Sequence, residues 1–405
     1  MAKATLASLG VFTGPDAPQD DDLSTCVHCG LCLNYCPTFR ATGLESESPR
    51  GRIYLMTAWQ RGVLPLTPEL SRHIDLCLGC RTCEAVCPSG VPYGRIIEAG
   101  RAELERLRPP TLKRRLVRRG LRDVLSHPGR LRVLAALTRA AQATHVAPLV
   151  PSARVLPRLG RTWRRPSSAL PPAGERRYRV AFLEGCVMPL MYGASHEAAL
   201  KLLRLAGCEV VFPPGQRCCG ALHAHNGDLA EARRLRDHNQ SVFQGLGVDA
   251  IIVDSAGCGA HMKDFYDGLE APVVDLLEFL DQVGLPPPSI PVEVRVAYQD
   301  ACHLAHAQGV KIQPRRLLAG IPGIQVVELQ NPDICCGAAG LYATLESSMA
   351  GRILEEKMND VIETDPEVLA VANPGCQMQL ELGVRNRKAR IEVLHLAELL
   401  ARAYP

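Results

Sequence analysis

Several features are scarce or missing in this sequence, and each excludes a class of protein. Aromatic residues make up only 4% of the 405 residues. No apolar stretch is long enough to cross a bilayer, and the first thirty residues lack a basic segment followed by an apolar one, so we expect neither a membrane-spanning helix nor a signal peptide. No G-x-G-x-x-G follows a predicted strand, so no flavin or nicotinamide site is visible. We expect a cytoplasmic location, and a peripheral position on the inner face of the cell membrane is compatible with it.

Charge is nearly balanced overall but is unevenly distributed. The formal net charge is +4. Between Arg106 and Arg179, nineteen Lys or Arg residues stand against only Asp123 and Glu175, so the rest of the chain is acidic. Leucines and valines recur at helical spacing from Arg106 to Leu137, and a proline-rich stretch follows from Pro148 to Pro172. This pattern predicts a helix pair or wrapping arm followed by an extended linker.

The basic region has two interpretations of equal weight. It could dock on anionic lipid or on an acidic partner subunit, or it could wrap the acidic parts of its own chain. Nucleic-acid binding is not expected, because no recognised motif or aromatic platform accompanies the charge.

In contrast to these absences, the chain contains 17 cysteines. Cytosolic thiols are kept reduced, so this number indicates metal or redox chemistry rather than disulfides. Eight of the cysteines form two runs with the spacing C-x2-C-x2-C-x3-C-P, from Cys26 to Cys36 and from Cys77 to Cys87. In such pairs of runs, three cysteines bind one [4Fe–4S] cluster and the fourth binds the other. The spacing therefore predicts one cluster on Cys26, Cys29, Cys32 and Cys87, and another on Cys77, Cys80, Cys83 and Cys36.

A pair of structural zinc sites is the main alternative, but zinc ribbons usually present two separate C-x2-C pairs. His28 lies inside the first run, where we expect it at the surface or beside the ligands. Between the runs, the segment from Pro49 to Trp59 has a helical pattern. We therefore expect a mainly helical frame that depends on its metal for stability.

The second half of the chain is an internal duplication. Cys186, Cys218, Cys219 and Cys258 recur, at offsets of about 117 residues, as Cys302, Cys335, Cys336 and Cys376. Short apolar runs without alternation precede these cysteines, and helical stretches such as 194–205, 229–243 and 349–361 separate the runs. Unalternated strands separated by helices predict parallel sheets covered on both faces. The cysteines then fall at the carboxyl ends of the strands, where open α/β sheets bind ligands.

Three roles compete for these repeated cysteines. They could bind a metal or a further iron–sulfur cluster. The vicinal pairs, each followed by a glycine, could instead act as reactive thiols, or the cysteines could be buried and structural, which is our expectation for the unrepeated Cys208. Four histidines near these loops are candidate proton carriers or quinone contacts, although a hydrogen-bonded supporting role is the more common one; they are His223, His225, His303 and His306.

Together, the two cysteine runs and the two Cys/Cys-Cys-Gly/Cys repeats resemble the iron–sulfur subunit of bacterial glycolate oxidase. The cysteine-rich subunits of anaerobic glycerol-3-phosphate dehydrogenase and of heterodisulfide reductase are more distantly similar. The segments that carry the likeness are 26–30, 49–55, 87–91, 183–186, 255–260 and 373–377. The resemblance implies an FAD-containing partner subunit that oxidises a 2-hydroxy acid, with this chain carrying electrons towards membrane quinone. Heterodisulfide reductase places a further cysteine where this chain has Ser255 and Asn373.

The predicted fold class is α/β, with an N-terminal mainly helical, ferredoxin-like two-cluster domain followed by two duplicated parallel α/β cysteine-rich domains. The expected boundaries are 1–105 for the two-cluster domain, 106–178 for the basic and proline-rich linker, 179–290 for the first repeat and 291–405 for the second. The predicted function is electron transfer within a glycolate oxidase complex. The alternatives are a thiol or disulfide reductase that uses the vicinal cysteines, and the equivalent subunit of a lactate or glycerol-3-phosphate dehydrogenase.

Overall fold

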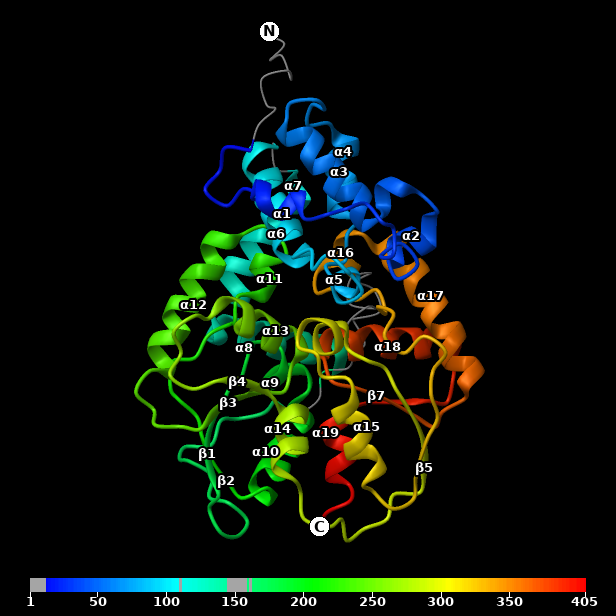
Figure 1. Ribbon diagram of the computed structural model, residues 1–405. Helices are drawn as coiled ribbons and strands as arrows, with labels where there is room; N and C mark the ends of the chain where they lie inside the picture. The colour runs from blue at the N-terminus through cyan, green and yellow to red at the C-terminus, as the bar shows by residue number, and fades with distance from the viewer. Residues whose placement is uncertain (1–11, 109–110, 144–158, 160–161) are drawn as a thin grey trace.

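The computed structural model describes residues 12–108, 111–143, 159 and 162–405 (Figure 1). An N-terminal helical region, a basic helical arm and two α/β repeats follow one another along the chain. Part of the proline-rich stretch, residues 148–158 and 160–161, lies outside the described residues.

The N-terminal region consists of short helices around a small apolar core. Its helices are α1 (Asp20–Ser24), α2 (Pro37–Thr42), η2 (Glu45–Glu47), α3 (Pro49–Gln60), α4 (Pro68–Asp75), α5 (Thr82–Ala85) and α6 (Tyr93–Leu107). Helices α3 and α4 both begin with proline after a capping residue, since Ser48 and Thr67 accept backbone N–H groups of the first turn. Trp59, Met56 and Ile96 are fully buried in the core between these helices.

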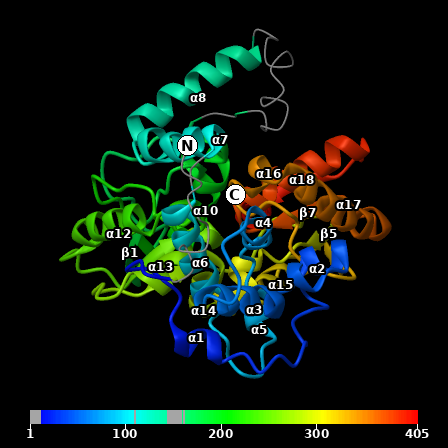
Figure 2. The same ribbon diagram turned by 90° about the horizontal axis from the view of Figure 1, so that it is seen from above.

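The basic arm forms α7 (Leu112–Gly120), the π-helical turn η3 (Leu121–Leu125) and α8 (Pro128–Ala143). Several of its arginines bind acidic residues of the same chain. Arg114 and Arg118 pair with Glu105, and Arg122 pairs with Asp228 at 2.7 Å. The inner side of the arm therefore wraps its own chain, whereas α8 lies at the edge of the molecule (Figure 2).

Each cysteine repeat contains one four-stranded parallel sheet. The first has the strand order β2-β1-β3-β4, and the second has the equivalent order β6-β5-β7-β8. The strands are β1 (Tyr178–Phe182), β2 (Cys208–Val211), β3 (Ala250–Val253), β4 (Val273–Asp275), β5 (Val294–Tyr298), β6 (Ile324–Val326), β7 (Val368–Val371) and β8 (Glu392–His395). The predicted fold class is confirmed, and β1 begins one residue before the expected boundary at 179.

Helices cover both sheets and connect their strands. The first repeat contains α9 (Met188–Met191), α10 (Gly193–Leu205), α11 (Ala221–Ala224), α12 (Leu229–Phe243), α13 (Ala256–Phe265) and α14 (Leu276–Val283). The second contains η6 (His303–Ala307), α15 (Ile312–Ala319), α16 (Tyr342–Leu345), α17 (Ser347–Thr364), α18 (Pro374–Arg387) and α19 (Leu396–Ala401). The predicted stretches 194–205, 229–243 and 349–361 correspond to α10, α12 and α17.

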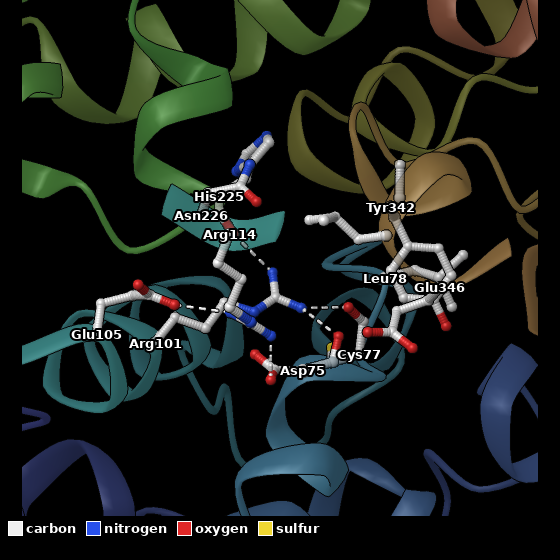
Figure 3. Close-up of a pocket in the computed structure, with 12 residues that line it drawn as sticks. Asp75, Cys77, Leu78, Arg101, Glu105, Arg114, His225, Asn226, Tyr342 and Glu346 are labelled. Carbon is white, nitrogen blue, oxygen red and sulfur yellow. Dashed lines mark hydrogen bonds and ion pairs between the residues drawn. The ribbon is translucent and has the colours of Figure 1, made fainter. Parts of the chain in front are cut away.

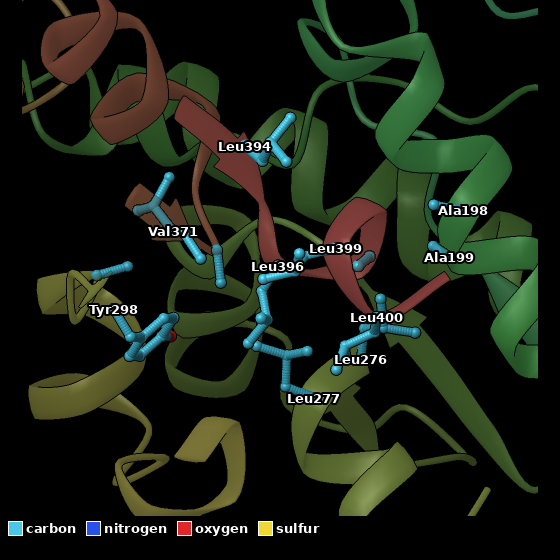
Figure 4. Packing of buried hydrophobic residues seen from close by; sticks show 14 of the residues in the cluster. Ala198, Ala199, Leu276, Leu277, Tyr298, Val371, Leu394, Leu396, Leu399 and Leu400 are labelled. Carbon is cyan, nitrogen blue, oxygen red and sulfur yellow. The ribbon is translucent and has the colours of Figure 1, made fainter. Parts of the chain in front are cut away.

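The two repeats share one core and contact each other through equivalent helices. Helix α10 packs on α19, and its counterpart α15 packs on α14, the counterpart of α19. Leucines of α14 and α19, among them Leu276 and Leu396, interdigitate there (Figure 4). Each fully buried leucine stabilises the fold by about 1.5–3 kcal/mol. The duplication thus packs as a pseudo-symmetric pair, in which each repeat completes the core of the other.

The N-terminal region lies over the carboxyl ends of both sheets (Figure 1). Helix α2 packs against α17, and α5 packs against η6. Tyr342 donates a hydrogen bond to the carbonyl of Leu76 at 2.9 Å, and Arg81 forms an ion pair with Asp264. No helix in the described ranges has the length and apolar character that a membrane span requires.

Candidate cluster-binding sites

The eight N-terminal cysteines surround two adjoining cavities. Cys26, Cys29, Cys32 and Cys87 line one cavity, which we call site 1. Cys36, Cys77, Cys80 and Cys83 line the other, which we call site 2, and Cys83 also borders site 1. The fourth cysteine of each run thus lies with the first three of the other run, as the spacing predicts. Among the residues that the structure describes, no three His, Cys, Asp or Glu side chains converge tightly enough to hold a single metal ion.

Hydrogen-bond donors point at the sulfurs of site 2. The Cys77 sulfur accepts the N–H of Gly79 at 3.3 Å and the hydroxyl of Tyr93 at 3.7 Å. Thr82 donates to the Cys80 sulfur at 3.4 Å. Such donors stabilise thiolates and tune iron–sulfur clusters, so the site fits a cluster chemically.

A fully buried arginine holds the Cys36 side of site 2. Arg52 donates to the Glu47 carboxylate at 2.8 Å and to the Thr38 hydroxyl at 3.1 Å. Thr38 lies 3.3 Å from the Cys36 sulfur. The arginine therefore connects the core of the N-terminal region to the loop that carries the crossing cysteine.

Site 1 lies closer to the surface. Cys29 is exposed, and Arg50 fixes the loop by donating to the carbonyl of His28 at 3.0 Å. The His28 ring lies edge to face with the Tyr54 ring, with centroids 6.4 Å apart, beside the exposed Val27. Burial raises the pKa of the Cys32 thiol to about 11. Since cluster ligands are thiolates, metal loading must release protons here.

The repeated cysteines also meet in two groups of four. Hydrogen-bonding contacts link the sulfurs of Cys218 to those of Cys186 and Cys219, and Cys219 to Cys258. The same chain of contacts runs through the second repeat, in the order Cys302, Cys335, Cys336 and Cys376. The neighbouring thiols lower the pKa of Cys218, Cys302 and Cys336.

A tight turn presents each vicinal pair. Gly220 and Gly337 have φ angles of +97° and +88°, a conformation that side chains disfavour. A Cβ atom on Gly337 would stand 2.8 Å from the carbonyl oxygen of Ala350. Cys208, in contrast, is buried in β2 away from both groups, where it packs in the apolar core.

Asn373, which precedes α18, bridges the two repeats. Its amide donates to the Cys376 sulfur at 3.4 Å and accepts the N–H of Gly257 at 3.1 Å. Ser255, its counterpart, is buried at the start of α13. Asn373 thus supports a cysteine in this chain.

Site 2 and the second repeat are in direct contact. Cys80, Cys302 and Cys335 are buried in one apolar cluster with Leu76 and Leu78. The sulfur sites therefore form a continuous row, from the exposed edge of site 1 through site 2 to the second repeat.

Of the four histidines singled out in the sequence, two have supporting contacts and two line a cavity. The His223 ring pairs with the hydroxyl of Ser126 at 3.0 Å, and that of His306 with the carbonyl of Asp333 at 3.0 Å. His225 and His303 stack on each other and border the cavity described below, together with Glu98 and His261. Sequence reasoning missed Glu98 and His261. The position of His261, three residues after Cys258 on α13, is the one signal that could have indicated it.

Next to this cavity, ion pairs join α7 to α4 and α6, and hydrogen bonds from α6 reach the first repeat (Figure 3). Arg101 donates to the carbonyl of His225 at 2.8 Å and to that of Cys77. Arg114 pairs with Asp75 and, at 2.7 Å, with Glu105. These contacts hold the loop of Cys77 against the first repeat.

Comparisons with known proteins agree with this arrangement. The 4Fe-4S dicluster domain matches residues 22–91, and the cysteine-rich domain matches residues 180–263 and 296–381. The probable glycolate oxidase iron-sulfur subunit of Bacillus subtilis is 36% identical, with 95% of each chain covered. The glycolate oxidase iron-sulfur subunit of Escherichia coli is 32% identical, also over 95% of each chain. The chain belongs to this family.

Two further comparisons cover most of this chain. A fumarate reductase (CoM/CoB) subunit of Methanothermobacter marburgensis is 28% identical over 96% of this chain and 74% of its own. A hypothetical protein from Helicobacter pylori has a similar fold, with a TM-score of 0.54 at 9% identity, over 92% of this chain and 72% of that one. Membership of the glycolate oxidase iron–sulfur subunit family confirms the predicted resemblance and the iron–sulfur cofactors, and it supports a role in electron transfer.

Proposed function

We propose that this chain is the electron-transfer subunit of a flavin-dependent glycolate oxidase complex. An FAD-containing partner subunit oxidises the 2-hydroxy acid, and this chain relays the electrons towards membrane quinone. The observation that carries the proposal is the continuous row of cysteine sites from the surface to the second repeat. Glycolate is favoured over lactate or glycerol 3-phosphate because the similar proteins of B. subtilis and E. coli are named for glycolate oxidase.

In this proposal, sites 1 and 2 each hold one [4Fe–4S] cluster, with the eight ligands assigned above. Bound clusters would supply reversible one-electron chemistry. The protein contributes the donors to the Cys77 and Cys80 sulfurs and the buried Arg52 beside Cys36. It also keeps the sites adjacent, since Cys83 borders both cavities.

Electrons enter at the exposed edge of site 1. Val27 and Leu31, on the loop that carries Cys26 and Cys29, are 66% and 56% exposed, and Tyr54 beside His28 is 63% exposed. Large apolar side chains next to a redox site are suited to a small, transient electron-transfer interface. We therefore assign this edge as the docking surface for the partner flavoprotein.

The repeated cysteines have two candidate roles. The first is a further cluster or metal on each group of four, which their convergence supports. The second is catalysis by the thiols themselves, which the lowered pKa of Cys218, Cys302 and Cys336 favours. Replacing Cys335 and Cys336 by serine separates the two roles. Loss of turnover with dithiol substrates supports thiol catalysis, whereas loss of iron supports a cluster.

The outer face of α8 supplies the peripheral membrane contact. Val133, Leu134 and Leu137 are 61%, 50% and 63% exposed, and the exposed Arg130 and Arg132 lie on the same helix. Exposed aliphatic and basic side chains together favour an anionic lipid surface.

Anaerobic co-purification with the untagged partner subunit tests the main proposal. The complex is assayed with glycolate, lactate and glycerol 3-phosphate, and iron is quantified. We expect glycolate-dependent reduction of the clusters, and about eight irons per chain for two four-iron clusters. A complex that reduces no cluster with any of the three substrates contradicts the proposal. More than eight irons per chain would mean that the cysteine repeats also bind iron.

A further inference from the structure

A cavity of about 410 Å³ lies where the N-terminal region meets both repeats. Its lining includes Glu98 of α6, His225 after α11, His261 of α13 and His303 of η6. These four titratable groups come from segments far apart in the sequence, and none of them is among the cysteine ligands or on the docking surface assigned above, although His303 Nδ1 lies 3.7 Å from the Cys302 sulfur. Their convergence on one cavity therefore calls for a separate explanation.

Glu98 and His225 form a hydrogen-bonded pair at this cavity. The Glu98 carboxylate lies 2.7 Å from Nδ1 of His225. Burial would raise the pKa of Glu98, but the hydrogen bond from His225 brings it below its ordinary value. The carboxylate therefore accepts the Nδ1 proton, and Nε2 is the nitrogen that can exchange a proton with a bound molecule. The ring is held in place by stacking on His303, with centroids 5.1 Å apart.

All three groups of buried sulfur sites border the same cavity through neighbouring residues. Gly79 and Arg81, which flank Cys80 of site 2, line it, as does His303, which follows Cys302. His261, three residues after Cys258, lines it from the first repeat, and its Nε2 atom is buried without a hydrogen-bond partner. A molecule bound in this cavity would thus lie close both to the sulfur sites, which would supply electrons, and to the histidines, which would supply protons.

The lining favours a neutral ligand over a carboxylate substrate. Its four arginines are already engaged. Arg81 pairs with Glu84 and Asp264, and Arg101 binds backbone carbonyls. The other two, Arg95 and Arg236, pair with Asp22 and Asp237. The side chains of Ile97 and Phe265 add apolar surface. A planar carbonyl compound can accept hydrogen bonds from imidazole and pack against these apolar groups without leaving a charge unpaired.

We propose that this cavity binds a quinone headgroup and that the Glu98–His225 pair delivers the protons for its reduction. The inference rests on the proposed function, which supplies the electrons. The quinone gains two electrons from the cysteine sites and two protons, so its two carbonyl groups become two hydroxyl groups. His225 gives each proton from Nε2 and is reprotonated from solvent. Glu98 acts through His225 and is therefore a positioning residue.

The test uses cluster-loaded protein reduced with dithionite, after the excess reductant has been removed, and measures reoxidation by two acceptors. A short-chain ubiquinone analogue needs protons, whereas ferricyanide takes single electrons and no proton. For Glu98→Gln and His225→Gln, we expect the limiting rate of reoxidation by the quinone to fall about 100-fold, the range of general acid–base catalysis. The ferricyanide rate, the iron content and the quinone concentration that gives half the limiting rate should stay near wild type. Glu98→Asp should recover part of the quinone rate.

Glu392→Gln is the matched control, because Glu392 forms an exposed ion pair with Arg402 in the second repeat, does not line the cavity and should leave both rates unchanged. Equal losses with both acceptors would indicate a structural role for the pair and would overturn the inference, as would an unchanged quinone rate. Because dithionite supplies the electrons, a partner that cannot reduce the protein contradicts only the proposed function.

Discussion

The buried pair of Arg52 and Glu47 provides a strong test of how the protein holds site 2. Both side chains are 1% exposed, and their closest contact is 2.8 Å. The guanidinium also donates to the carbonyls of His73 and Glu47, at 2.6 and 2.7 Å, and to the Thr38 hydroxyl. Replacing Arg52 by methionine removes all of these donors and leaves the Glu47 carboxylate buried, with His73 as its remaining partner.

Breaking such a pair from one side costs about 3–5 kcal/mol, most of it from the uncompensated charge. We therefore expect Arg52→Met to shift the denaturant midpoint of the cluster-loaded protein strongly downwards and to release iron from site 2. The double variant Arg52→Met/Glu47→Leu should recover much of the loss, because it leaves no buried charge. Arg402→Met is the control. Arg402 pairs with Glu392 at 2.8 Å, but both are 41–49% exposed, so its loss should cost at most about 1 kcal/mol.

Unfolding is followed anaerobically by circular dichroism and by cluster absorbance, and midpoints are compared because loss of metal makes a two-state free energy ill-defined. If Arg52→Met were no less stable than Arg402→Met, or if the double variant were no better than the single one, the buried pair would not hold the site. Where Arg52→Met retains its clusters, loss of a positive charge beside Cys36 and Cys77 should lower the reduction potential of site 2.

Three further predictions concern other parts of the molecule. Burial raises the pKa of Asp275 to about 7, so ionisation of this buried group lowers the stability of the folded protein as the pH rises from about 4 to 7. In thermal unfolding, Asp275→Asn, which keeps the helix cap, should be more stable than wild type at pH 8 by up to about 4 kcal/mol and equal to it near pH 4. Val27→Asp should raise the KM of this chain for its partner flavoprotein in a glycolate assay, whereas Ile312→Asp, at a 65% exposed position on α15, should not. Equal effects of the two substitutions would show that the partner does not dock at the edge of site 1. Leu134→Glu should weaken flotation with anionic vesicles at low salt, and unchanged flotation would refute the contact through α8.

Local sequence signals were sufficient for the strands and for most of the helices. The unalternated apolar run before Cys258 forms β3, one of the two inner strands of its sheet, and the helical stretch 229–243 forms α12. The crossed grouping of Cys36 and Cys87 also follows from spacing alone, since the geometry of two adjacent runs leaves little freedom. In each case the signal lies within a few residues of the feature that it predicts.

Contacts between distant segments gave no such signal. Nothing in the sequence indicates that Cys80 packs beside Cys302 and Cys335, more than 200 residues away. Glu98 lies on an ordinary amphipathic helix, and its pairing with His225 depends on how α6 settles on the first repeat. For the same reason, the sequence did not decide whether the basic arm binds its own chain or another surface, because its ion pairs with Glu105 and Asp228 depend on tertiary structure.

The N-terminal region makes the two repeats unequal, although their sheets and cysteine positions are equivalent. In the second repeat all four cysteines are buried, and Cys302 and Cys335 lie in one apolar cluster with Cys80 of site 2. In the first repeat Cys186 and Cys258 remain half-buried. Since α5 packs against η6 of the second repeat, the row of sulfur sites continues there. Substitution of Cys335 should therefore impair electron passage from site 2 more than the equivalent substitution of Cys218, even if the two repeats bind the same cofactor.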